Sequence, residues 1–81
     1  MKKVYRFTAK WCQPCKMLTK TLRSINPDIE IVIVDIDEDI DLPMKYGVRS
    51  VPTMIMIHND EEIKRMTGVK SAQEIEDWLT N

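Results

Sequence analysis

Several features that define other protein classes are scarce or missing in this 81-residue sequence. Its two cysteines are too few to cross-link a small secreted scaffold. No apolar run approaches the roughly 18–20 residues that span a membrane. Twelve Lys and Arg residues against thirteen Asp and Glu residues give a net charge of -1, without the basic excess of nucleic-acid-binding proteins. We therefore expect a cytoplasmic monomer without a membrane or nucleic-acid partner.

Glycine and proline are also rare, with two and four residues respectively, and no linker, repeat or low-complexity stretch is visible. The 43% apolar and 31% charged content is typical of a globular protein rather than a disordered one. A chain of this length buries only about 60–65% of the surface that it exposes when unfolded. We expect a single domain over residues 1–81, with a thin core.

Hydrophobic patterning predicts a strand, a helix and a second strand in the first half of the chain. Val4–Thr8 is rich in β-branched and aromatic residues, which favour a strand. Apolar residues recur at helical spacing over residues 15–25, and Asn26-Pro27 should end that helix. Ile31–Val34 is a short, continuous apolar run, as expected for a parallel strand covered on both faces.

The second half of the chain predicts a short helix, two strands and a last helix. Residues 39–47 can form the short helix, and Met54–Ile57 is another continuous apolar strand. A hairpin turn should connect it to a strand at Glu62–Met66. Ser71 and Glu74 form a capping-box pair at the start of the last helix. The order strand-helix-strand-helix-strand-strand-helix indicates an α/β fold, with a four-stranded mixed sheet flanked by three helices.

The two cysteines are close together, in the segment Trp11-Cys12-Gln13-Pro14-Cys15-Lys16. This segment lies where the first predicted strand passes into the first predicted helix. Two intervening residues allow both sulfur atoms to meet across one helical turn, so a reversible disulfide is sterically possible.

The cysteines are expected to lie in different environments. Cys12 lies at or just before the helix N-terminus, where unpaired N–H groups and the positive end of the helix dipole favour a thiolate. Lys16 adds positive charge, and Pro14 fits the first turn because its missing N–H is not needed there. Cys15 lies one turn further, on the apolar face. This asymmetry predicts that Cys12 is the exposed nucleophile and Cys15 the shielded, resolving cysteine.

Two other interpretations of the cysteines are open. They could be a buried structural pair, although such pairs rarely lie beside an exposed Trp at a strand-to-helix junction. They could also supply half of a zinc site, but zinc normally takes four ligands and His58 is the only histidine. We expect a redox dithiol and no bound metal.

Two segments and one glycine together resemble the thioredoxin family. They are residues 9–16, Ala-Lys-Trp-Cys-Gln-Pro-Cys-Lys; residues 45–53, Lys-Tyr-Gly-Val-Arg-Ser-Val-Pro-Thr; and Gly68. A Trp-Cys-x-Pro-Cys-Lys segment followed later by Val-Pro-Thr is a specific combination, whereas Cys-x-x-Cys alone is a weak signal. The likeness covers nearly the whole chain and implies a thioredoxin-like fold and reduction of protein disulfides.

The resemblance also implies a substrate groove and a set of partners. In the family, the counterpart of Pro52 has a cis peptide bond facing the cysteines, and the residue before it, here Val51, offers backbone hydrogen bonds to the substrate. Trp11 and Gly68 would complete the border of the groove. No bound cofactor is implied, because NADPH would recharge the protein through a thioredoxin reductase. Its substrates would be disulfide-containing client proteins, with ribonucleotide reductase as one candidate.

The sequence departs from the family pattern in ways that bear on redox tuning. It begins at what would be the family's second strand, so we expect a fold without the family's usual N-terminal strand and helix. Gln13 replaces the common glycine between the cysteines, where the dipeptide with Pro14 tunes the redox potential.

A further departure is Arg6, which stands where thioredoxins usually have a buried aspartate. Because arginine does not deprotonate in proteins, we expect Arg6 to raise the positive potential near Cys15 and to pair with Asp35. The alternative is a partly exposed Arg6 whose guanidinium reaches solvent.

Two further functions are open beside a thioredoxin-like reductase. A glutaredoxin-like, glutathione-dependent oxidoreductase would suit the short chain. However, Gln13-Pro14 is not the glutaredoxin Pro-Tyr, and residues 67–70 lack the paired glycines and acidic residue that usually hold glutathione. A non-catalytic module that uses the groove to bind a partner is the third candidate, against which the intact Cys-x-x-Cys argues.

Overall fold

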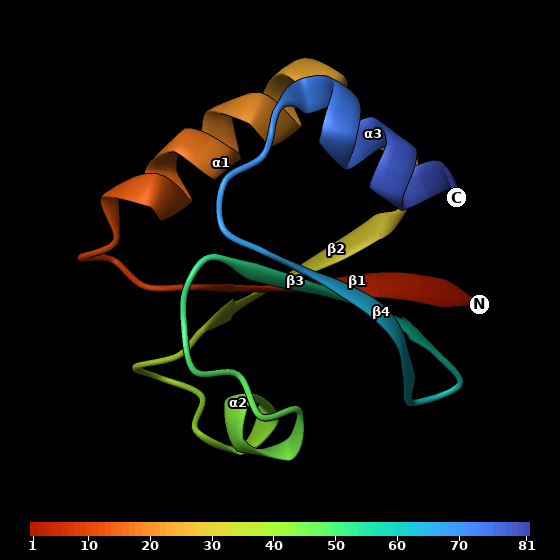
Figure 1. Cartoon of the computed structure of the whole chain (residues 1–81). Helices are drawn as coiled ribbons and strands as arrows, with labels where there is room; N and C mark the ends of the chain where they lie inside the picture. Colours follow the sequence, from red (N-terminus) through yellow and green to blue (C-terminus); the bar gives the residue numbers. More distant parts are fainter.

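The computed structural model describes residues 1–81 as four strands and three helices in the predicted order (Figure 1). The elements are β1 (Lys2–Thr8), α1 (Gln13–Ile25), β2 (Glu30–Asp35), α2 (Asp41–Lys45), β3 (Thr53–His58), β4 (Glu61–Thr67) and α3 (Ala72–Thr80). The strands form one mixed sheet in the order β2-β1-β3-β4. β1 pairs parallel with β2 and antiparallel with β3, which pairs antiparallel with the edge strand β4. The predicted α/β architecture is confirmed.

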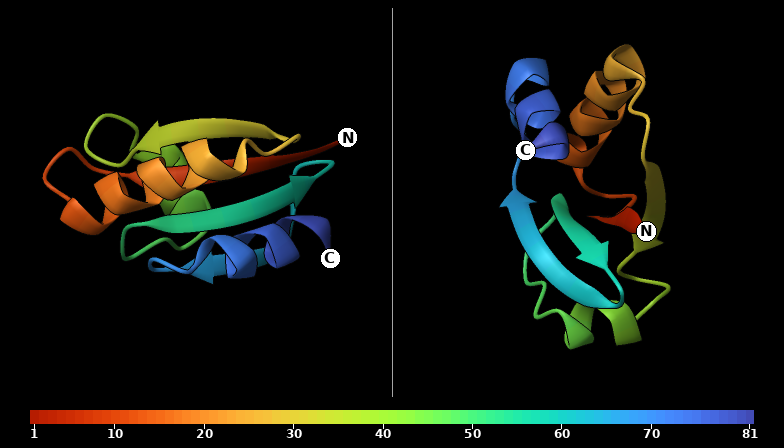
Figure 2. Two further views of the ribbon diagram at one scale, coloured as in Figure 1. Left: turned by 90° about the horizontal axis from the view of Figure 1, so that it is seen from above. Right: turned by 90° about the vertical axis from the view of Figure 1, so that its right-hand side faces the viewer.

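The helices cover both faces of the sheet (Figures 1 and 2). Helices α1 and α3 lie on one face and the short α2 lies on the other. Apolar side chains fill the space on each face. Those under α1 and α3 include Val4, Leu18, Met54 and Ile75, and the cluster toward α2 is built around Phe7. Consecutive residues of β1 and β3 thus point to opposite layers of core, as the pleat of a strand requires.

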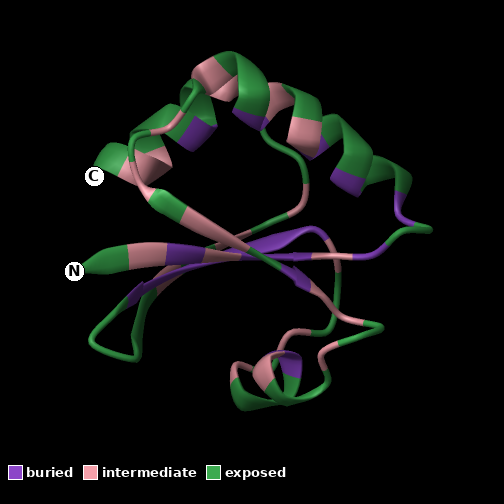
Figure 3. Cartoon of the chain, turned by 180° about the vertical axis from the view of Figure 1, so that it is seen from behind, coloured by how far each residue is buried: buried purple, intermediate pink, exposed green.

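Strand β3 is the centre of this core, and Figure 3 shows its continuous burial. All its residues from Thr53 to Ile57 are buried, while His58 at its end is exposed. A continuous apolar run is the pattern of a strand covered on both faces. β3 is paired with β1 on one side and β4 on the other, and helices cover both faces of the sheet.

The expectation that Ile31–Val34 is covered on both faces is wrong. β2 lies at the edge of the sheet and pairs only with β1. Val34 is buried at 4% exposure, but Ile33, on the opposite face, is 62% exposed. An edge strand has a neighbour on one side only, so a side chain there stays exposed unless a helix extends over it.

The ends of the longer helices are fixed by local hydrogen bonds. Asn26 ends α1 in the left-handed conformation, with φ of 54°, and its N–H donates to the Leu22 carbonyl at 3.0 Å. At the start of α3, the Glu74 N–H donates to Ser71 Oγ at 3.1 Å, and the Ser71 N–H donates to Glu74 Oε1 at 3.2 Å. The predicted capping box is therefore confirmed. None of the helices combines the length and hydrophobicity that crossing a membrane requires.

Candidate redox site

Cys12 and Cys15 form a disulfide at the junction between β1 and α1, with 5.3 Å between their Cα atoms. β1 ends at Thr8, and the chain turns through a backbone hydrogen bond from the Cys12 N–H to the Ala9 carbonyl, 3.1 Å long. The helix then begins at Gln13. The pair is thus held between the end of a central strand and the first turn of a helix.

Cys12 is the N-cap residue of α1, as the sequence predicts. Its extended backbone precedes the helix, and its Sγ accepts a hydrogen bond from the Cys15 N–H at 3.2 Å. A helix N-terminus has unpaired N–H groups and partial positive charge, so this position stabilises a thiolate when the disulfide is reduced.

The prediction of an exposed Cys12 is wrong for this disulfide form. Cys12 is only 4% exposed, and Cys15 is 2% exposed as expected. Both pack with Ala9, and the half-buried Ile36 and Val51 lie against the same cluster. Cys12 is covered because its sulfur is bonded to Cys15 and apolar residues from the loops that follow β2 and precede β3 pack against it.

The segment before β3 lies beside the cysteines. The Val51–Pro52 peptide bond is cis, as the resemblance implies, and Val51 contacts the cysteine cluster. Gly68 is brought to the same place, because its N–H donates to the Pro52 carbonyl at 2.8 Å. The φ of Gly68 is +85°, a conformation that residues with a Cβ rarely adopt. None of the loop backbone hydrogen bonds uses Val51, so its N–H and carbonyl have no backbone partner within the chain.

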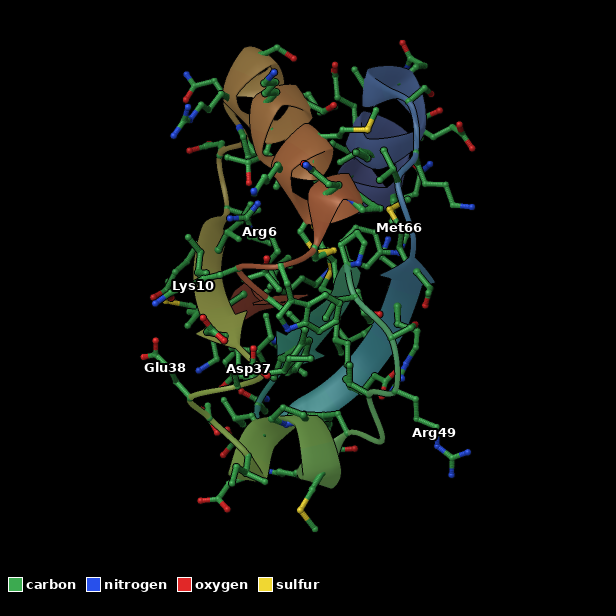
Figure 4. All side chains as sticks on the ribbon, turned by 90° about the vertical axis from the view of Figure 1, so that its left-hand side faces the viewer. Arg6, Lys10, Asp37, Glu38, Arg49 and Met66 are labelled. Carbon is green, nitrogen blue, oxygen red and sulfur yellow. A yellow bond between two sulfur atoms is a disulfide. The ribbon has the colours of Figure 1, made fainter.

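Trp11 lies at the exposed border of the site, with 67% of its surface accessible. Its indole Nε1–H donates to Asp37 Oδ2 at 2.9 Å. Asp37 is not among the residues predicted for the site, and its one signal in the sequence is its place in an acidic stretch directly after an apolar strand. Beside it, Lys10 Nζ lies 3.5 Å from Glu38 Oε2 in an ion pair that is exposed on both sides. Figure 4 shows Asp37, Glu38 and Lys10 along one side of the molecule.

The remaining residues of the motif are on the surface of the first helical turn. Gln13, Pro14 and Lys16 are all exposed, and Pro14 lies in the first turn of α1, where no N–H is required. The structure therefore places these three side chains around the disulfide without enclosing it.

Arg6 contradicts both expectations made for it. It does not pair with Asp35, whose Oδ1 instead accepts a hydrogen bond from the Asp37 N–H at 2.9 Å. It is also not partly exposed, because only 7% of its surface is accessible. The register pairs Arg6 with Ile33, and its side chain lies on the α1 side of the sheet, where Nη1 donates to Thr19 Oγ1 at 2.9 Å. Asp35 lies two residues further along β2, at the cysteine end of the sheet.

Arg6 is connected to the cysteines through Thr19. The Thr19 hydroxyl accepts from Arg6 and donates to the Cys15 carbonyl at 3.1 Å. Burial lowers the pKa of Arg6, and the nearby positive charge of Arg23 lowers it further. Arginine nevertheless stays protonated, so a positive charge is held beneath the first turns of α1.

No group of three or more His, Cys, Asp or Glu residues is arranged to hold a metal ion. The cysteine pair forms a disulfide, whose chemistry is exchange between sulfur atoms.

Comparison with known proteins gives a consistent result. The family model described as Thioredoxin matches residues 2–81. Among curated proteins, the thioredoxin of Rickettsia bellii (strain RML369-C) is 35% identical over 79 residues, covering 93% of this chain and 75% of its own. The thioredoxin of Bacillus subtilis (strain 168) is 32% identical over 77 residues, covering 90% of this chain and 74% of its own.

Solved structures show the same likeness in three dimensions. Thioredoxin NaTrxh from Nicotiana alata superposes with a TM-score of 0.87 at 30% identity, covering 98% of this chain and 70% of that one. The thioredoxin of Fasciola hepatica superposes with a TM-score of 0.86 at 27% identity, covering 98% and 78% of the two chains.

Proposed function

We propose that this chain, which belongs to the thioredoxin family and is a dithiol–disulfide oxidoreductase, reduces disulfides of client proteins through Cys12 and Cys15. The observation that carries the proposal is the disulfide at the N-terminus of α1, beside the cis Val51–Pro52 segment.

The proposed reaction consists of two exchange steps. The Cys12 thiolate attacks one sulfur of the client disulfide, forming a mixed disulfide and releasing the other client sulfur as a thiolate that takes up a proton. Cys15 then loses its proton and attacks Cys12 Sγ, which releases the second client sulfur. The client gains two electrons and two protons, and the chain ends with the Cys12–Cys15 disulfide that the structure contains.

The different positions of the cysteines support this division of roles. Cys12 is the N-cap residue, where the helix terminus favours a thiolate. Cys15 lies inside the first turn of the helix, past the N-cap position, and within bonding distance of Cys12. Cys12 is therefore assigned as the nucleophile and Cys15 as the resolving cysteine.

The client is proposed to lie along Trp11, Val51, Pro52 and Gly68. The free backbone groups of Val51 support pairing with an extended client segment, in the manner of an added strand. Trp11 adds an exposed aromatic surface beside the sulfur atoms.

Thioredoxin-family chemistry uses no bound cofactor, so the oxidised form must be recharged by another protein. We propose NADPH and a thioredoxin reductase as this source, and disulfide-containing clients such as ribonucleotide reductase as substrates. A reducing compartment, the cytoplasm, suits a dithiol whose working form is reduced.

Insulin reduction, followed by turbidity, tests the proposed function. One assay contains NADPH and thioredoxin reductase, and a second contains glutathione and its reductase. We expect turnover in the first. Activity only in the second would identify a glutathione-dependent enzyme instead, and inactivity in both together with partner capture would identify a binding module.

The two cysteines provide matched variants for the mechanism. Cys12→Ser should abolish turnover, whereas Cys15→Ser should retain attack and accumulate mixed disulfides with insulin, visible on non-reducing gels. Normal turnover by Cys15→Ser would contradict the two-cysteine mechanism.

Gln13, Pro14, Lys16 and Arg6 are proposed to tune the cysteines. For Arg6 the support is its hydrogen bond to Thr19, which in turn donates to the Cys15 carbonyl. Removing this charge in Arg6→Ala should raise the pKa of the Cys15 thiol in the reduced protein, because a nearby cation favours the thiolate. An unchanged thiol titration would exclude the electrostatic role.

A further inference from the structure

Arg6 is a buried charge without an acidic partner. The residue is 7% exposed, and the single hydrogen bond of its side chain is the one that Nη1 donates to Thr19 Oγ1. Nε is buried and has no hydrogen-bond partner. The ion pairs of the chain are Lys10–Glu38 and Arg65–Glu62, so no carboxylate neutralises Arg6. A buried guanidinium normally requires a paired anion, because desolvation of an unpaired charge is costly.

An open pocket adjoins this charge. It lies between α1 and β2, has a volume of about 390 Å³, and is lined by Arg6 together with the exposed Arg23. In Figure 4 the side chain of Arg6 lies between these two elements. None of the residues that line the pocket is acidic. The pocket therefore contains two permanently charged arginines and no acidic residue to balance them.

The rest of the lining is mixed. Asn26 and Thr19 supply polar groups, while Ile31 and Ile33 belong to the apolar part of the wall. Ile33 is 62% exposed, although most isoleucines of this chain's strands are buried or partly buried. An exposed apolar side chain beside two arginines suits a ligand with both an anionic and an apolar part.

We infer that this pocket binds a small organic anion in which a phosphate or carboxylate group is attached to an apolar body. The oxyanion lies between Arg6 and Arg23, since guanidinium groups match the planar, bidentate geometry of these anions. The apolar body packs on Ile31 and Ile33 at the edge of the sheet. This site lies on the β2 side of α1, apart from the client groove beside Val51, and anion binding there does not require that the chain reduces client disulfides.

Titration of the oxidised 81-residue protein with model anions tests the site. Phenyl phosphate and benzoate are the two anionic probes, and benzyl alcohol is the neutral probe of similar shape. NMR shifts of the Arg6 Nε–H group and of the Ile33 and Asn26 amides report binding at constant low ionic strength, because salt screens the interaction. We expect saturable shifts with phenyl phosphate, benzoate or both, which also identifies the preferred oxyanion, and none with benzyl alcohol.

Three arginine variants connect the binding to the pocket. Arg6→Met and Arg23→Met should each weaken anion binding by about tenfold, the effect of losing one charge-assisted contact. Arg49→Met is the matched control, because Arg49 is an exposed arginine outside the pocket. The affinity of this variant for the anionic probes should equal that of the wild type. Arg23 is on the surface, so its variant tests the site without a change in the buried layer.

Three outcomes would overturn the inference. They are the absence of saturable shifts with both anions, equal shifts with benzyl alcohol, or an affinity loss in Arg49→Met as large as in the two pocket variants.

Discussion

Strands β2 and β3 flank β1 on opposite sides and bring the two borders of the redox site to the same end of the sheet. β2 ends at Asp35, opposite Thr8 of β1, while β3 begins at Thr53, opposite Phe7. Five of the six residues of β3 are buried, whereas β2 has one buried residue, Val34. One border of the site thus extends from the most buried strand and the other from an exposed edge.

Because of this difference in burial, the border beside β3 is held more firmly than the border beside β2. On the β3 side, Pro52 is buried and its carbonyl accepts a hydrogen bond from the Gly68 N–H. On the β2 side, Trp11 and Asp37 meet through one exposed hydrogen bond. A thiol-exchange protein that accepts different clients can use both properties: a fixed backbone to align the client disulfide, and an exposed aromatic border that adapts to the client surface.

The largest expected effect is in the core of β3. Ile55→Ala should lower the free energy of unfolding by about 2–5 kcal/mol, because Ile55 is completely buried and its truncation leaves a cavity. Ile33→Ala is the same type of truncation on β2, where the side chain is 62% exposed, and should change stability by about 0.5 kcal/mol or less. Urea denaturation with the disulfide intact measures both. Equal losses would show that β2 is as firmly packed as β3.

The same pair of strands shows what the sequence could and could not predict. Ile31–Val34 and Met54–Ile57 are indistinguishable as short, continuous apolar runs, and coverage on both faces is expected from the sequence for Ile31–Val34, the run that lies at the edge. Local signals are sufficient to predict a strand, because they depend on side-chain type and spacing. They do not specify which strands are neighbours, and burial of an apolar strand depends on those neighbours. The edge position of β2 therefore appears only in the fold.

In the redox site, too, features set by one local segment were predictable and features set by distant segments were not. The N-cap position of Cys12 and the shielding of Cys15 were predictable, because both follow from helix geometry along one segment. The partner of Arg6 was not, because Asp35 and Thr19 are both plausible until the register and the position of α1 are known. Asp37 was missed for the same reason, since its bond to Trp11 joins residues that are distant in sequence.

The second-largest effect is expected at Arg6, on the β2 side. Arg6→Met should raise the free energy of unfolding by about 1–2 kcal/mol, because it replaces an unpaired buried charge by an unbranched apolar side chain that can occupy the space of the arginine stem. The measurement is urea denaturation without added organic anions, which would stabilise the wild type by binding. Arg23→Met is the control and should have little effect, because Arg23 is exposed. A destabilised Arg6→Met would mean that the Thr19 hydrogen bond outweighs the cost of burial.

A smaller effect is expected at the exposed border of the redox site. Asp37→Ala removes the acceptor of the Trp11 indole, a contact worth about 0.5–1 kcal/mol, and should lower kcat/KM for insulin reduction by about two- to fivefold. Glu38→Ala is the matched control, because Glu38 meets only the exposed Lys10 and should leave kcat/KM unchanged. Equal losses in both variants would indicate a general effect of negative charge rather than orientation of Trp11.

The smallest effect concerns the exposed end of α3, the helix that covers β3 through the buried Ile75. Hydrogen bonds from the Ser71 backbone and side chain hold the pKa of Glu74 below its ordinary value of 4.5. A lowered folded-state pKa contributes stability above the unfolded-state value, and that contribution is lost as the pH falls through the folded-state value. The difference in unfolding free energy between wild type and Glu74→Gln should therefore shrink on acidification, while Glu76→Gln, on the same helix outside the capping box, provides the reference. A difference that stays constant with pH would show that the cap acts through hydrogen bonding without its charge.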